Sequence, residues 1–89
     1  MRVLTNDRNQ IKATDAIWLR CRNYQVVPLN AGLRRQIPEL EDAIRRGISG
    51  RPDWHRRNFY TLALKSGWAY IHVREETKTV YLVAYRSEL

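Results

Sequence analysis

The sequence predicts an α+β fold in which two or three short helices pack on a small antiparallel sheet. Three stretches lead to this prediction: a two-stranded ribbon at 68–86, a capped helix at 38–46 and a second helical segment at 54–65. With 89 residues, the chain is expected to form one domain (1–89) with a single small core. Residues 1–13 are mostly polar and are expected to form a loose arm or a short edge strand.

The stretch 68–86, WAYIHVREETKTVYLVAYR, reads as a β-hairpin whose register follows from its own pattern. If Glu76 and Thr77 form the tip, aliphatic residues face each other across the two strands. The opposed pairs are then Val73 with Val80, Ile71 with Leu82, Ala69 with Ala84, Arg74 with Thr79, His72 with Tyr81, Tyr70 with Val83, and Trp68 with Tyr85. A slip of one residue would mix the apolar and polar faces, so the pattern selects this register.

Because successive strand residues point to opposite faces, the hairpin has two unlike sides. One side is aliphatic and is expected to face the core: Ala69, Ile71, Val73, Val80, Leu82 and Ala84. The other is aromatic, with a basic residue at each end: Trp68, Tyr70, His72, Tyr81, Val83 and Tyr85, with Arg74 and Arg86. Either a helix or strand covers this second side, or its rings stack on bases while its arginines contact phosphates.

The stretch 38–46, PELEDAIRR, is the strongest helix prediction. Pro38 suits the first helical position, and Gly47 suits a C-terminal cap. Acidic residues in the first turn and Arg45 and Arg46 in the last turn complement the helix dipole. The buried stripe is expected to consist of Leu40, Ala43 and Ile44.

Two other stretches allow both helix and strand. Residues 14–23 alternate like a strand, but Thr14 is a good N-cap, which favours a helix. Residues 24–27 are expected to form a short strand ended by Pro28. Asp53 can cap a helix at 54–65, which we expect, although NFYTLAL at 58–64 is rich in strand-forming residues and could form a meander with the hairpin.

The net charge of +7 arises from 16 Lys and Arg, most of them Arg, against 9 Asp and Glu. Such an excess favours a polyanionic partner, of which nucleic acid is the commonest. The guanidinium group also binds phosphate through two parallel hydrogen bonds. The candidate nucleic-acid-binding residues are Arg45, Arg46, Arg51, Trp54, His55, Arg56, Arg57, Arg74, Lys78 and Arg86, with Trp68 and Tyr70 as stacking rings. The alternative for the 45–57 cluster is a solvated charged surface.

Several other classes of function are not expected. The single cysteine, Cys21, cannot form an internal disulfide, and no signal peptide or membrane span is recognisable, so we expect a cytoplasmic protein. Two histidines and one cysteine, none in ligand spacing, predict no metal and no cofactor. An enzyme is less expected than a binding protein. The one candidate for metal-free RNA cleavage is His72, opposite Tyr81 and near Arg74, although a packed histidine is the more usual role.

The expected order of helix, short strand, two helices and ribbon over 14–86 resembles a winged helix-turn-helix domain. That resemblance implies that the 54–65 helix enters the major groove, with residues 54–58 nearest the bases. It also implies that Arg74 and Lys78, at the tip of the ribbon, contact backbone phosphates. The leading hypothesis is therefore a small nucleic-acid-binding module of bacterial or phage type.

Read as three strands, 58–86 is similar instead to the end of RelE/ParE-like toxins, small basic bacterial proteins. That resemblance implies mRNA cleavage on the ribosome, the activity of the RelE branch of the family. Arg86 could match the family's late arginine, whereas Ala69 replaces its earlier basic residue. A third hypothesis is a protein–protein adaptor or homodimer that uses the aromatic side of the hairpin as its interface.

Overall fold

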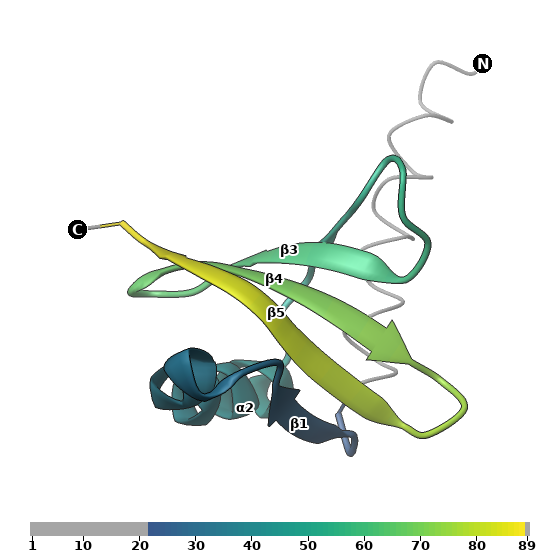
Figure 1. Cartoon of the computed structure of the whole chain (residues 1–89), viewed down its shortest axis with the longest axis horizontal. Coiled ribbons are helices and arrows are strands. Elements are labelled where there is room, and N and C mark those ends of the chain that lie inside the picture. The colour runs from purple at the N-terminus through teal and green to yellow at the C-terminus, as the bar shows by residue number, and fades with distance from the viewer. Residues whose placement is uncertain (1–21, 89) are drawn as a thin grey trace.

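The computed structural model describes residues 22–88, in which one α-helix packs against a five-stranded mixed sheet (Figure 1). The elements are β1 (Gln25–Pro28), the 3-10 helix η1 (Ala31–Gln36), α2 (Ile37–Arg46), β2 (Arg51–Pro52), β3 (Phe59–Ala63), β4 (Gly67–Arg74) and β5 (Thr79–Ser87). The strands lie in the order β1-β5-β4-β3-β2. Strand β1 runs parallel to β5, and the remaining neighbours are antiparallel.

The predicted fold class is therefore wrong. The described residues are mostly sheet, with one α-helix, rather than two or three helices on a small antiparallel sheet. The main error is the helix expected at 54–65, because β3 occupies its second half and pairs with β4 from Phe59 to Ala63. Without that helix, the winged helix-turn-helix order is also lost.

The physical reason for this error lies in Asp53. Its carboxylate does cap backbone N–H groups, as expected: Oδ1 accepts hydrogen bonds from His55 N at 2.8 Å and Arg56 N at 3.1 Å. The capped turn leads into a loop rather than a helix. The residues after this loop, Phe59–Ala63, favour a strand. Their backbone groups form hydrogen bonds with β4, and this pairing also buries Leu62.

The helix prediction at 38–46 is confirmed by α2, and the strand prediction at 24–27 by β1. Leu40 and Ile44 of α2 are buried against the sheet. The rest of the buried apolar core comes from three strands: Leu62, Ala69, Ile71, Val73, Val80 and Leu82. Residues 1–21, which include the expected arm at 1–13 and most of the ambiguous stretch at 14–23, lie outside the described residues.

The hairpin register is confirmed near its tip and shifts further along. Val73 pairs with Val80 and Ile71 with Leu82, as predicted, but a β-bulge then adds one residue to β5. The bulge pairs Ala69 with Tyr85, so Tyr85 faces the core side, and Ala84 is exposed rather than buried. The predicted pairs beyond Ile71 are thus wrong by one residue.

The displaced Tyr85 takes part in a polar cluster that joins the sheet to the helix. Ser66, in the turn between β3 and β4, donates from its backbone N to Glu39 Oε2 at 3.1 Å and from its Oγ to Oε1 at 2.6 Å. The hydroxyl groups of Ser66 and Tyr85 also share a hydrogen bond. The side chain of Glu39, from the first turn of α2, therefore fixes the position of the β3–β4 turn.

Candidate nucleic-acid interface

A row of aromatic rings crosses the sheet on the side away from α2. Phe59 of β3 pairs with His72 of β4, which pairs with Tyr81 of β5, so the three side chains project from the same face. The rings of Phe59 and His72 are stacked, with centroids 4.2 Å apart and planes 3° apart, and His72 and Tyr81 lie 6.3 Å apart at 30°. All three side chains are half-buried, so part of each stays accessible to solvent. We call these three residues the aromatic row.

The two predicted stacking residues lie on the same face, further along β4. Tyr70 contacts the aromatic row, with its ring centroid 5.5 Å from that of Phe59. Its hydroxyl group donates a hydrogen bond of 2.6 Å to Asp53 Oδ2. Trp68 is 37% exposed, and its indole N–H bonds to the carboxylate of Glu88.

Four arginines surround these rings. The guanidinium carbon of Arg56 lies 4.2 Å from the centroid of the Phe59 ring, a cation–π contact at one end of the aromatic row. Register places the others on the same face: Arg51 beside Thr61, Arg74 beside Thr79, and Arg86 beside Trp68. We call Arg51, Arg56, Arg74 and Arg86 the arginine frame.

The carboxylates near this face mostly accept hydrogen bonds from groups other than guanidinium. Asp53 accepts them from the Tyr70 hydroxyl and from two backbone N–H groups, and the Tyr70 bond is the main reason why its pKa is lowered. The same bond raises the pKa of Tyr70. Within the arginine frame, Arg74 does approach a carboxylate, at 3.7 Å from Glu76, but both side chains are exposed and such a pair is weak.

The imidazole of His72 lies at the middle of the aromatic row, where its pKa is lowered. Burial is the main cause of its lowered pKa, and the positive charges of Arg74 and Arg56 lower it further. A neutral imidazole can stack flat on Phe59 without adding charge. It also retains a nitrogen lone pair that can accept a proton.

The predicted basic cluster at 45–57 is divided by the structure. Arg45 and Arg46 belong to α2, on the core side of the sheet, and both bind Asp42: Arg45 Nη2 lies 3.1 Å from Oδ1, and Arg46 Nε lies 2.9 Å from Oδ2. These bonds hold the pKa of Asp42 below its usual value. These two arginines are therefore separated from the arginine frame.

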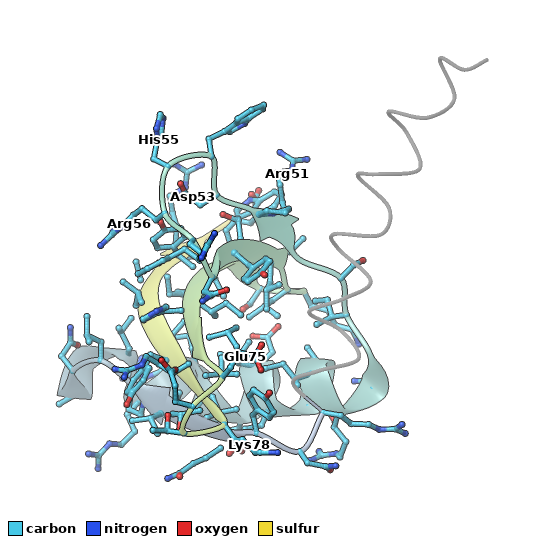
Figure 2. All side chains as sticks on the ribbon, turned by 90° about the vertical axis from the view of Figure 1, so that its right-hand side faces the viewer. Arg51, Asp53, His55, Arg56, Glu75 and Lys78 are labelled. Carbon is cyan, nitrogen blue, oxygen red and sulfur yellow. The ribbon has the colours of Figure 1, made fainter. Side chains whose placement is uncertain are left out.

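The rest of the cluster stays together around the loop between β2 and β3. Figure 2 shows Arg51, Asp53, His55 and Arg56 gathered at one end of the molecule, with Lys78 well away from them. Trp54, His55 and Arg57 are exposed on this loop. Lys78 lies in the β4–β5 turn with a positive φ of 49°.

Of the three residues of the aromatic row, only Phe59 is not indicated by the sequence as a ring of the site. Tyr81 belongs to the aromatic side of the hairpin, whose rings are predicted as able to stack on bases, although the two named stacking residues are Trp68 and Tyr70. The helix expected at 54–65 gives Phe59 no place in the sheet, whereas the alternative strand at 58–64 allows it to lie opposite His72, where the structure has it.

Comparison of the chain with protein-family models, with curated proteins and with solved structures gives no significant match. Among residues 22–88, no helix is long and apolar enough to cross a membrane. In the same part of the chain, no three His, Cys, Asp or Glu side chains gather in a way that could hold a metal ion.

Proposed function

We propose that the protein binds single-stranded nucleic acid on the outward face of its sheet, in the cytoplasm. The observation that carries the proposal is the aromatic row of Phe59, His72 and Tyr81 inside the arginine frame. Proteins that bind single strands combine aromatic side chains, on which bases stack, with a positively charged path for the backbone. Stacking needs bases that are free of a duplex partner, which favours a single strand over a double helix.

This mode of binding replaces the groove-reading helix of the sequence hypothesis. The aromatic row crosses three neighbouring strands, and its rings project from one face. Because Phe59 and His72 stack on each other and Arg56 covers Phe59, bases meet the ring surfaces that remain free, while the guanidinium groups around the edge neutralise the phosphates. Arg45 and Arg46 take no part, because they lie on the other layer and are occupied by Asp42.

The test is fluorescence anisotropy with labelled single-stranded RNA, single-stranded DNA and duplex of about ten nucleotides, within the usual site sizes of single-strand-binding domains. The double variant Arg51→Ala/Arg56→Ala should weaken single-strand binding strongly. Its matched control is Arg45→Ala/Arg46→Ala, which removes the same charge from the α2 layer and should bind nearly as well as the wild type. Equal losses in the two variants would show that net charge, and not the sheet face, drives binding.

RNA cleavage is the second candidate function, and the extended conformation of Phe59–Ala63 favours it. With that strand, β3, β4 and β5 form the meander that the resemblance to RelE/ParE-like toxins implies. The imidazole of His72 would then take the proton of a ribose 2′-hydroxyl, whose oxygen attacks the adjacent phosphorus and displaces the 5′-oxygen. The imidazolium would return the proton to that departing oxygen, while Arg74 or Arg56 stabilises the charged phosphate.

Cleavage and simple binding are separated by following RNA integrity and cell growth on expression. A nuclease should degrade RNA or arrest growth, and His72→Ala or Arg86→Ala should relieve the effect. Intact RNA that is bound but never cut would leave binding as the function. A salt-insensitive protein complex that is lost on Tyr70→Ala would instead support an adaptor or homodimer.

A further inference from the structure

The loop between β2 and β3, residues 53–58, has a defined shape. Its ends are closed by a hydrogen bond of 2.9 Å from Asp53 N to the Phe59 carbonyl, and Phe59 N donates to the Arg56 carbonyl at 3.3 Å. Asn58 has a positive φ of 69°, and its carbonyl accepts a hydrogen bond from Val73 N. Together with the cap from Asp53, these bonds fix the loop to the edge of the sheet.

This ordered loop presents a bare indole ring to solvent. Trp54 is 96% exposed, whereas Leu29, the next most exposed large apolar side chain of the described residues, is 59% exposed. A tryptophan ring is among the largest apolar surfaces that folding can bury, so an exposed one contributes almost nothing to the core. The loop, rising from the sheet away from α2 in Figure 1, is held in a form that keeps this ring available.

The surroundings of Trp54 indicate the chemistry of its partner. Arg51, His55 and Arg57 lie within three residues of Trp54 in the sequence, and Figure 2 shows Arg51, His55 and Arg56 at the same end of the molecule. The nearby acid, Asp53, already uses both carboxylate oxygens within the protein. Trp54 is also the only apolar residue of the loop, DWHRRN, so the loop presents a single ring among polar and basic residues rather than a continuous apolar patch. A flat ring among cations suits a base and its phosphates.

We propose that Trp54 stacks on one unpaired base of the strand that also lies on the aromatic row. This inference rests on the proposed function and adds a separate stacking position to it. Arg56 links the two positions, because it belongs to the loop and its guanidinium group covers the Phe59 ring. The bound nucleic-acid strand would pass from the rings of the sheet over Arg56 to the indole of Trp54.

Tyr70 acts in this scheme as a positioning residue for the loop. Its hydroxyl group donates to Asp53 Oδ2, while Oδ1 of the same carboxylate holds the backbone of His55 and Arg56. Tyr70→Phe keeps the ring and the charge but removes this donor. The contribution of Trp54 to binding should then shrink, because the loop is no longer tied to β4.

The primary test compares oligonucleotide affinities of the wild type, Trp54→Ala and Trp54→Phe. Loss of one base–aromatic stack should weaken single-strand binding about 5- to 160-fold for Trp54→Ala, and much less for Trp54→Phe, which keeps a ring. Leu29→Ala is the control, since it truncates another exposed apolar side chain far from the loop in sequence, and it should bind like the wild type. The Trp emission that is present in the wild type and missing in Trp54→Phe should be quenched by the oligonucleotide.

If the wild type binds the oligonucleotide and Trp54→Ala binds it as tightly as Leu29→Ala does, the stacking role of Trp54 is overturned and the proposed function stays intact. A wild type that binds no single-stranded oligonucleotide would overturn both. A Trp54 emission shift on anionic phospholipid vesicles without one on oligonucleotides would also refute the inference, in favour of a membrane-surface anchor.

A double-mutant cycle tests the positioning role. The affinity loss from Trp54→Ala should be several-fold smaller in a Tyr70→Phe background than in the wild type. It should be unchanged in a Tyr81→Phe background, which removes a hydroxyl group from the same face but not from the loop. Equal losses in the three backgrounds would exclude coupling through the Asp53–Tyr70 hydrogen bond.

Discussion

The salt dependence of binding can be calculated from the arginine frame. If Arg51, Arg56, Arg74 and Arg86 each neutralise one phosphate of a single strand, log K should fall with log salt at a slope of about −2.8, from about −0.7 per contact. Raising salt from about 50 to 200 mM should then weaken binding about 50-fold. Removing two members with Arg51→Ala/Arg86→Ala should reduce the slope to about −1.4 and the affinity loss over the same range to about sevenfold.

The assay is fluorescence anisotropy titration of one labelled single-stranded oligonucleotide at several salt concentrations. Arg45→Ala/Arg46→Ala has the same net charge as the test variant and should keep the wild-type slope, because those side chains are paired with Asp42. The reasoning would be refuted if both double variants lowered the slope equally. A complex whose affinity does not respond to salt would contradict any phosphate contact from these four residues.

Three further predictions concern folding. Gly67→Ala should lower the free energy of unfolding by about 1–3 kcal/mol or more, because a Cβ would clash with the backbone carbonyl oxygen of Arg86 and would also lie 2.8 Å from the Tyr85 hydroxyl. The nearest atom to a Cβ at Gly32 is 3.2 Å away, so urea denaturation of Gly32→Ala gives the comparison. Leu40→Ala should cost about 2–5 kcal/mol, because it empties a fully buried site, and exposed Leu29→Ala should change stability by less than about 0.5 kcal/mol in the same assay. The pKa of His72 is lower in the folded protein than its ordinary value of 6.5, so as pH falls through 6.5 the unfolded chain binds more protons than the folded chain and stability should decrease. His72→Phe should remove that part of the pH dependence of stability, and an unchanged profile would contradict the reasoning.

Strong local patterns allowed part of this structure to be predicted. The alternation in the hairpin gave the correct partners for Val73 and Ile71, because a slip would have exposed their aliphatic side chains. The terminal residues of the 38–46 helix gave its position, since Pro38 and Gly47 are favourable only at helix ends. In both cases, residues close in the sequence determine the outcome.

Contacts between distant residues explain what could not be predicted. The cap at Asp53 is real, but pairing of Phe59–Ala63 with β4 decides the conformation of the segment after it. The β-bulge in β5 could not be predicted from the alternation of apolar and polar residues. It moves Tyr85 to the core side of the sheet, where its hydroxyl group shares a hydrogen bond with Ser66. For the candidate site, the composition indicated arginines and rings, but only the sheet register shows which of them share a face.

The position of β5 within the sheet also bears on how the protein is made. This strand comes last in the described residues, yet it pairs with both β1 and β4, so residues 25–28 have their backbone partners at 79–82. Because synthesis runs from the N-terminus, residues 25–28 are made long before residues 79–82, so β1 leaves the ribosome without its backbone partner. Pairing of β1 with β5 is therefore a late, long-range step of folding, and until it occurs the unpaired edge of β1 is open to wrong partners.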